Sequence, residues 1–426
     1  MPQPKNMFSL ILEFLKKIKN NFFPFYKNSD LKFVFKKLNE DISNNKKNAM
    51  FVGGCERKHL LNEKVDDIDI ATSLTVDQIK NKFEKTKFKI IDSGIEHGTV
   101  TLVLNKLKIE LTTLRKDIKT DGRHAEIEYT DDWQVDSQRR DFTINAIYLD
   151  INGNIFDPQK GIKDLKNNIV KFIGEPEKRI EEDYLRIIRF IRFSLEYMSE
   201  VEATTLDAIK LNLDGIKKIS KERILSELFK ILNTKNFIKL NQNKQLKNIF
   251  ELVFPELKHL ERLNRLNNAV FKKYFDKNFL LSVLLIDHTS NHEYFSHKYN
   301  VSNNLKEKLN LVAKNYVGLK SNKDFFSKDL KKQIYFFGKK NLFLLNILYF
   351  SNNKKMKLND YFDTLNNIKK MNIPNFPFDG NFLKNKGMKE GALIGKTLKL
   401  IEDEWLENNF KISNEKVLEI IKSQDS

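Results

Sequence analysis

The sequence of 426 residues contains a single cysteine, Cys55, and it is poor in proline (8) and glycine (15). One cysteine excludes an intramolecular disulfide, which suits a reducing compartment. No apolar run is long enough to cross a bilayer, so we expect no membrane partner. Residues 7–18 are apolar with interspersed lysines but lack a small-residue cleavage site, which argues against a secretory signal. These absences predict a cytoplasmic protein.

Acidic residues are fewer than basic ones: the chain has 57 Asp and Glu and 75 Lys and Arg, which gives a net charge of +18. An excess of positive charge fits a polyanionic partner such as RNA. Lysine is spread along the whole chain together with Asn, Ile and Phe, so the charge alone does not locate a binding surface. A hydrophobic content of 40% allows two or more domains with their own cores.

Two adjacent glycines, Gly53 and Gly54, follow a short apolar run at residues 49–52. The run predicts a buried strand. The glycines predict a strand-to-helix turn whose backbone N–H groups approach a phosphate closely. Arg57 then lies in the first turn of the following helix, where its guanidinium reaches the same phosphates. A Gly-Gly turn alone is a weak signal, and it gains weight from the acidic residues that follow.

Asp67 and Asp69 alternate with Ile68 and Ile70. In a strand over residues 67–71 this alternation turns both carboxylates to one face and both isoleucines to the core. Carboxylates held about 7 Å apart along a strand repel each other unless a cation lies between them. A divalent metal with hard oxygen ligands fits, in particular magnesium, and such carboxylates bridge the ions of two-metal phosphoryl transfer. The alternative is a strand end with two solvated aspartates, and the upstream glycines favour the metal site.

Residues 107–114 alternate between apolar and polar side chains and predict a neighbouring strand. Glu110 lies within it and is therefore a candidate third catalytic carboxylate beside Asp67 and Asp69. The alternative is an exposed strand glutamate without a catalytic role.

A second pair of strands is predicted around Asn152-Gly153, a strong turn signal between residues 145–150 and 154–156. This hairpin places the Arg-Arg-Asp sequence of residues 139–141 just ahead of a sheet strand, at the edge of the predicted site. Arginines there suit phosphate, and a carboxylate suits a ribose hydroxyl.

Residues 182–197 carry apolar side chains at helical spacing and predict an amphipathic helix. Asp183 and Arg186 are three positions apart, so they share a face of this helix. An ionised Asp accepts hydrogen bonds and Arg donates them, which cytosine and adenine satisfy and uracil and guanine do not. Each buried group left unpaired costs about 1–3 kcal/mol. The alternative is a surface ion pair worth a few tenths of a kcal/mol.

Four stretches, residues 53–72, 94–101, 139–146 and 182–186, occur in the order of the motifs of class II tRNA nucleotidyltransferases. Over roughly residues 30–235 the sequence resembles this family, which comprises CCA-adding enzymes and the related bacterial poly(A) polymerases. The resemblance implies an α+β fold. Its polymerase-beta-like nucleotidyltransferase head, a small mixed sheet with helices, is followed by an all-helical neck, body and tail. It also implies template-independent addition of C, C and A to the 3′ end of tRNA, with release of pyrophosphate.

The resemblance also implies roles for the motif residues. The expected metal ligands are Asp67 and Asp69, which form the catalytic carboxylates together with Glu110. Asp141 is implied as a ribose contact, with Asn145 in the same motif. Mg²⁺ is the expected cofactor, and tRNA, CTP and ATP are the expected partners. The candidate nucleotide-binding residues are Gly53, Gly54, Arg57, Arg139, Arg140, Asp141, Asn145, Asp183 and Arg186.

Four regions are expected on this basis. They are an amino-terminal helical arm over residues 1–28, the catalytic head over 29–157, a helical neck with the base-reading helix over 158–235, and a helical, tRNA-binding body and tail over 236–426. Within the last region, residues 279–286 and 342–350 are apolar and predict core helices.

The chain departs from the family pattern at one place, because Arg57 is followed by Lys58 where the family usually has Asp, and Glu56 stands in an apolar slot. An inward Lys58 either puts a cation where a carboxylate normally orients its neighbours or adds a triphosphate contact. An outward Lys58 has no effect. An RNA-binding relative that has lost catalysis is therefore the alternative of another class.

A poly(A) polymerase or an A-adding enzyme of the same family is the closer alternative. Family members of the poly(A) type tend to show Gly-Arg-Arg-Phe where this chain has His-Gly-Thr-Val-Thr at residues 97–101, which favours CCA addition. Residues 116–133 are long enough to form the flexible loop that a CC-only enzyme is expected to lack.

Overall fold

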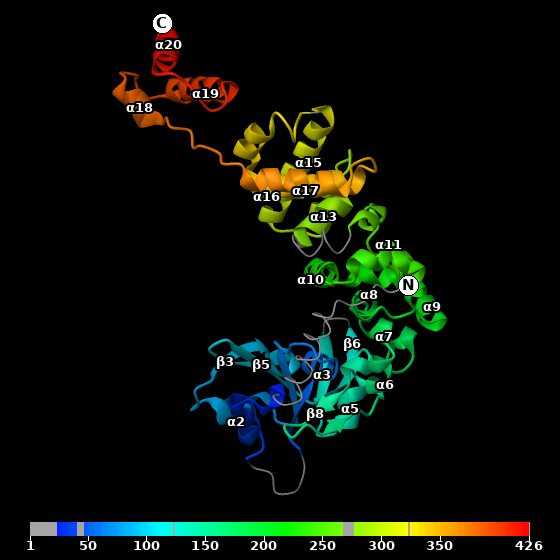
Figure 1. The fold of residues 1–426 in the computed structure, drawn as a ribbon. Helices are drawn as coiled ribbons and strands as arrows, with labels where there is room; N and C mark the ends of the chain where they lie inside the picture. Colours follow the sequence, from blue (N-terminus) through cyan, green and yellow to red (C-terminus); the bar gives the residue numbers. More distant parts are fainter. Residues whose placement is uncertain (1–23, 41–46, 122–123, 267–276, 323, 426) are drawn as a thin grey trace, which may run out of the picture. The chain divides into compact units, whose positions relative to one another are not determined.

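The computed structural model describes residues 24–40, 47–121, 124–266, 277–322 and 324–425. The chain forms two compact units (Figure 1), the first comprising residues 1–267 and 297–300 and the second residues 268–296 and 301–426.

The predicted amino-terminal arm lies mostly outside the described residues, which begin at residue 24. The first described elements are the 3-10 helix η1 (Phe25–Lys27) and helix α2 (Ser29–Leu38). The predicted ends of the neck, at residues 157/158 and 235/236, both fall within the first unit. The division into four regions stays a prediction.

Within the described residues the first unit is built on a seven-stranded sheet of order β3-β4-β5-β2-β1-β8-β9. Strands β2 and β5 run parallel, and the other neighbouring pairs are antiparallel. The sheet is therefore mixed, as predicted for the head. In spatial order the strands are β3 (Lys89–Gly94), β4 (Thr99–Leu104), β5 (Leu107–Thr113), β2 (Ile68–Thr72), β1 (Ala49–Val52), β8 (Tyr148–Leu149) and β9 (Ile155–Phe156).

The alternation in β2 has the predicted consequence. Ile68 and Ile70 are buried in a core that includes residues of α2 and of helix α4 (Val76–Phe83). Asp69 faces the opposite side of the sheet. The parallel register sets Asp69 directly opposite Glu110 on β5. The strand begins at Ile68, so Asp67 lies just ahead of it.

The predicted hairpin around Asn152-Gly153 is present as the antiparallel pair β8 and β9. Asn145, expected in its first strand, instead lies in the 3-10 helix η3 (Thr143–Asn145), and the strand begins at Tyr148.

Residues 116–133, which were expected to form a flexible loop, instead contain most of two paired strands. Strands β6 (Arg115–Asp121) and β7 (His124–Tyr129) pair antiparallel as a separate two-stranded sheet, and helix α5 (Trp133–Gln138) follows. Pairing satisfies backbone groups that a loop would leave to water. The expectation of a loop rested on length alone, and it did not use the alternation of apolar residues and glutamates over residues 125–129.

The amphipathic helix predicted over residues 182–197 is present as α8 (Leu185–Tyr197), which begins three residues later than predicted. The preceding helix, α7 (Pro176–Glu182), ends just before Asp183. Helix α8 buries a continuous apolar face and packs against helix α10 (Lys221–Leu232). The other helical elements described in this unit are α6 (Gly161–Lys166), α9 (Ala203–Leu211), α11 (Lys244–Val253) and the 3-10 helices η2 (Ile95–His97), η4 (Leu213–Lys218), η5 (Phe237–Gln242) and η6 (Leu260–Arg265).

The second unit is helical throughout its described elements. Both apolar runs predicted as core helices are confirmed, because residues 279–286 fall largely within α13 and residues 342–350 within α16, and most of their leucines are buried. No described helix is long and apolar enough to span a membrane. The helices are α13 (Lys277–Leu285), α14 (Asn291–Lys298, which ends in the first unit), α15 (Asn303–Ser321), α16 (Leu330–Asn352), α17 (Leu358–Lys370), α18 (Gly380–Asn385), α19 (Ala392–Glu407) and α20 (Asn414–Asp425).

Candidate active site

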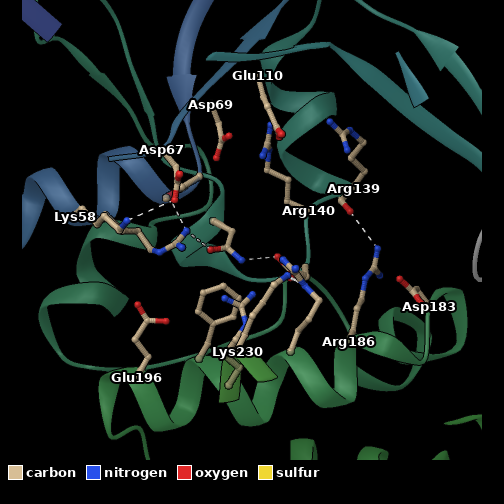
Figure 2. Close-up of a pocket in the computed structure, with 18 of the residues that line it drawn as sticks. Lys58, Asp67, Asp69, Glu110, Arg139, Arg140, Asp183, Arg186, Glu196 and Lys230 are labelled. Carbon is tan, nitrogen blue, oxygen red and sulfur yellow. Dashed lines mark hydrogen bonds and ion pairs between the residues drawn. The ribbon is translucent and has the colours of Figure 1, made fainter. Parts of the chain in front are cut away.

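A polar cavity of about 780 Å³ lies in the first unit between the sheet and helix α8 (Figure 2). Every residue that the sequence singled out as catalytic or nucleotide-binding lines it. The acidic residues come from the sheet side and the predicted base-reading residues from the α7–α8 region. These lining residues are Gly53, Gly54, Arg57, Asp67, Asp69, Glu110, Arg139, Arg140, Asp141, Asn145, Asp183 and Arg186.

The glycine turn is built around Asp69. Gly53 has φ +90°, a conformation that favours glycine, and helix α3 (Gly54–Leu60) starts directly after it. A Cβ at Gly53 would lie 3.3 Å from Asp69 Oδ2, so the turn approaches this carboxylate closely. The backbone N–H of Gly54 donates a hydrogen bond to the same carboxylate. The turn therefore fixes the position of Asp69.

The three acidic residues lie close enough for their negative charges to repel one another. Burial raises the pKa of Asp69, and the negative charges of Glu110 and Asp67 raise it further. Asp67 is outside the strand with 85% of its side chain exposed, and Glu110 Oε1 lies 3.3 Å from Lys108 Nζ. A divalent cation would relieve this repulsion, and carboxylate oxygens are suitable hard ligands.

The described residues contain no group of three His, Cys, Asp or Glu side chains gathered closely enough to hold a metal ion. Asp67 and Asp69 remain the candidate ligand pair. Their oxygen donors and the mutual repulsion of their negative charges fit a hard divalent cation. Glu110 is adjacent to this pair through the register of the two strands.

Arg57 is held by its surroundings and is nearly buried. Its Nη1 donates to the carbonyl oxygen of Gly53 at 2.6 Å and to Oδ1 of Asn145, and its Nε donates to the Tyr197 hydroxyl at 3.0 Å. The guanidinium also lies 5.0 Å from the centre of the Phe193 ring, within cation–π range. Arg57 therefore links the glycine turn to helix α8.

Asp141 continues this network. Its Oδ1 accepts from Asn145 Nδ2 at 2.7 Å, and its Oδ2 accepts from Arg189 Nε at 2.7 Å. Burial alone would raise the pKa of Asp141, but the charge of Arg189 and the hydrogen bonds outweigh it and hold the pKa well below its usual range. Asp141 is therefore an ionised carboxylate fixed between the head strands and α8. Arg189 was not predicted as a site residue.

Arg139 and Arg140 share one anchor, the fully buried carboxylate of Asp136. Arg139 Nε donates to Oδ1 at 2.8 Å, and Arg140 Nη2 donates to Oδ2 at 2.9 Å. The Tyr148 hydroxyl donates to Oδ2 at 2.7 Å. Asp136 was not predicted as a site residue. It lies three and four residues before the two arginines, at the end of a short helix, and this spacing could have indicated the contacts.

Asp183 and Arg186 line the cavity but do not share a helix face, so that part of the prediction was wrong. Asp183 lies between the two helices, and its Oδ1 accepts from the Leu185 backbone N–H at 3.1 Å. Its Oδ2 lies 2.8 Å from Arg223 Nη2. A carboxylate that accepts the N–H of Leu185, the first residue of α8, cannot also lie inside that helix.

Arg186 has partners of its own. Its Nη1 donates to Glu182 Oε2 at 2.5 Å and to the Arg179 carbonyl at 2.7 Å. Its Nη2 donates to the Arg139 carbonyl at 3.3 Å, as drawn in Figure 2. Glu182 and Arg223, which hold the two predicted base-reading residues, were not singled out from the sequence.

The two unusual residues of α3 have different environments. Glu56 is buried, with Oε1 2.9 Å from the Cys55 sulfur, and burial raises the pKa of Glu56 to about 8. Lys58 faces the cavity, where its ammonium pairs with Asp66 and lies 3.9 Å from Asp67 Oδ2. The outward alternative for Lys58 is therefore wrong.

Comparisons with known proteins agree with this site. The model of the Poly A polymerase head domain matches residues 49–171, and that of the probable RNA and SrmB-binding site of polymerase A matches residues 200–260. The mitochondrial CCA tRNA nucleotidyltransferase 1 of Danio rerio is 30% identical, covering 89% of this chain and 88% of the relative. The CCA-adding enzyme of Staphylococcus haemolyticus is 31% identical over 88% of this chain and 93% of its own length.

The fold is similar to that of solved CCA-adding enzymes. The Bacillus stearothermophilus enzyme in complex with CTP aligns with a TM-score of 0.72 at 21% identity, over 92% of this chain and 96% of that one. The Thermotoga maritima enzyme complexed with tRNA_CCA aligns with a TM-score of 0.63 at 22% identity, over 92% and 95% of the two chains.

The mixed-sheet head and its acidic, arginine-lined cavity define a nucleotidyltransferase. Membership of this class implies the use of divalent metal ions in general. Within the class, the chain belongs to the CCA tRNA nucleotidyltransferases, the CCA-adding enzymes.

Proposed function

We propose that this protein adds C, C and A to the 3′ end of tRNA from CTP and ATP, without a template, and releases pyrophosphate. The observation that carries the proposal is that Asp67, Asp69 and Glu110 line the same cavity as Asp183 and Arg186. A reacting triphosphate and a base under selection can therefore occupy one space. Relatives that carry this activity in their names cover most of the chain and support the proposal.

The phosphate end of the nucleotide binds against the glycine turn. Arg57 and the Gly53-Gly54 backbone hold phosphate oxygens, and the two arginines anchored on Asp136 add positive charge from the other wall. Asp67 and Asp69, beside Glu110, would hold Mg²⁺, which would neutralise charge on the phosphates and lower the pKa of the attacking hydroxyl. The tRNA 3′-hydroxyl then attacks the α-phosphorus, and pyrophosphate leaves.

The sugar and base are read from the α8 side. Asp141, ionised by its contact with Arg189, accepts a hydrogen bond from the ribose, and Asn145 holds Asp141 in place. Asp183 accepts from the base amino group while Arg186 donates to a ring acceptor, which selects C and A over U and G. Both side chains also have protein partners, Arg223 for Asp183 and Glu182 for Arg186. Each therefore uses only its remaining donors or acceptors to bind the base.

The remaining regions serve the RNA partner. We propose that the head over residues 29–157 carries the chemistry and the neck over residues 158–235 the base selection. The helical region over residues 236–426 then binds tRNA, supported by the overall excess of positive charge. A cytoplasmic location is proposed from the single cysteine, and subcellular fractionation with a compartment marker tests it.

Incubating the purified protein with Mg²⁺, tRNA lacking its terminal CCA and each labelled nucleotide separately, then together, tests the function. We expect two C residues from CTP alone and completion by one A when ATP is added. A tRNA that already ends in CCA is the matched control and should accept nothing. Runs of A, a single A without C, or no incorporation would contradict CCA addition.

A further inference from the structure

Lys58 lies on α3 at the acidic side of the cavity and reaches toward Asp67 (Figure 2). Its ammonium is hydrogen-bonded to Oδ1 of Asp66 and lies 3.9 Å from Oδ2 of Asp67. Both aspartates precede strand β2, with side-chain exposures of 57% and 85%. Lys58 thus has two acceptors one residue apart.

The second acceptor is a proposed metal ligand. A lysine ammonium and a divalent cation carry charge of the same sign, so they cannot share one carboxylate without repulsion. Solvent weakens that repulsion, because Asp67 is mostly exposed. Asp66 offers the ammonium another partner, so Lys58 need not leave the region when Asp67 binds metal.

We propose that Lys58 is a positioning residue that competes with the divalent cation for Asp67, and that Asp66 draws Lys58 away from it. This inference rests on the proposed function, since it takes Asp67 as a metal ligand. It requires opposite effects from two neighbours. Removing Lys58 strengthens metal binding, whereas neutralising Asp66 leaves Lys58 to Asp67 and weakens metal binding. A lysine that only contacts the triphosphate requires neither effect.

Mn²⁺ binding to the full chain tests the inference directly. Mn²⁺ is titrated into protein with CTP but without tRNA, so that no transfer occurs, and bound ion is read by electron paramagnetic resonance. With a partly solvated charge at this distance, Lys58→Met should lower the half-saturating Mn²⁺ concentration about 3- to 10-fold, and Asp66→Asn should raise it roughly 2- to 5-fold. The double variant should bind Mn²⁺ like Lys58→Met, because without the Lys58 ammonium Asp66 no longer affects the competition for Asp67.

Lys64→Met is the matched control, since Lys64 is exposed on the same connection and does not line the cavity. It should leave Mn²⁺ binding unchanged. Equal half-saturation in Lys58→Met and wild type, or shifts of the same sign in both single variants, would overturn the inference. These results leave nucleotide incorporation by the wild type intact. Failure of the wild type to incorporate nucleotide would instead overturn the proposed function.

Discussion

Nε of Arg189, on helix α8, lies 2.7 Å from Oδ2 of Asp141, in the segment between α5 and η3. The contact joins the proposed ribose-reading carboxylate to the helix that carries Arg186, one of the two proposed base-reading residues. Through Asn145 it extends to Arg57 beside the glycine turn. The proposed phosphate and ribose contacts are therefore parts of one hydrogen-bonded network that is anchored on α8.

Breaking that contact should cost both stability and activity. In Arg189→Met the buried Asp141 keeps its charge without its main partner. We expect a loss of about 3 kcal/mol, the low end for a broken buried pair, because Arg189 is 30% exposed. Denaturant unfolding measures the loss, and kcat/KM for CTP should fall as well. A double-mutant cycle with Asp141→Asn is the control, and additive effects of the two substitutions would contradict a direct coupling.

Asp67→Ala should abolish nucleotide incorporation and leave the fold intact. The side chain is 85% exposed and lies outside the strand, so its loss should change the free energy of unfolding by no more than about 0.5 kcal/mol. Labelled-nucleotide assays and circular dichroism measure the two properties. Glu63→Ala, an exposed neighbour that does not line the cavity, should retain activity. Normal turnover in Asp67→Ala would refute the metal assignment.

Arg186→Ala should erode the preference for CTP and ATP over UTP. A base paired with Arg186 loses one buried hydrogen bond, worth about 1–3 kcal/mol of discrimination. The ratio of kcat/KM for CTP and UTP measures it. Lys178→Ala is the control, because Lys178 is exposed on the preceding helix and pairs with Glu175 at the surface. An unchanged nucleotide profile in Arg186→Ala would remove the base-reading role.

Glu56 should make the protein less stable as the pH rises. Burial raises the pKa of Glu56 to about 8, against 4.5 for the free side chain. Below pH 4.5 both the folded and the unfolded chain hold the proton. As the pH rises toward 8 the unfolded chain loses it while the folded chain keeps it, so this contribution to stability is lost. The size is about 1.4 kcal/mol per unit of pKa difference.

Glu56→Gln removes this titration. Unfolding measured at pH 5 and pH 8 should show the variant gaining a few kcal/mol relative to wild type between the two values, on the scale of that linkage. Glu63→Gln, an exposed carboxyl near the same helix, should show no such change. A constant difference between Glu56→Gln and wild type would show that Glu56 is ionised in the folded protein.

The parts of the site that could be predicted are those that depend on residues close together in the sequence. Alternation fixed the faces of Asp69 and Glu110, and paired glycines marked the turn beside them. The spacing of apolar residues predicted α8 but gave no sign of the break at Asp183. There Asp183 accepts the Leu185 backbone N–H, which is a local contact, and it also pairs with Arg223, 40 residues away, which no local pattern contains.

Long-range partners explain the other omissions. Arg189 meets Asp141 across 48 residues, and Arg57 meets Tyr197 across 140. A single sequence shows that such charged groups exist but not which of them meet. The hairpin of β6 and β7 was missed for a different reason, because the expectation of a loop rested on length and did not use the apolar and polar alternation over residues 125–129.

The register between β2 and β5 sets the spacing of Asp69 and Glu110 by the distance between hydrogen-bonded strands, about 4.8 Å. Asp69 also depends on the Gly53-Gly54 turn, whereas Asp67 lies outside the strand. Substitutions in turns other than these can therefore change what enters the cavity while the distance between the Asp69 and Glu110 backbones stays the same.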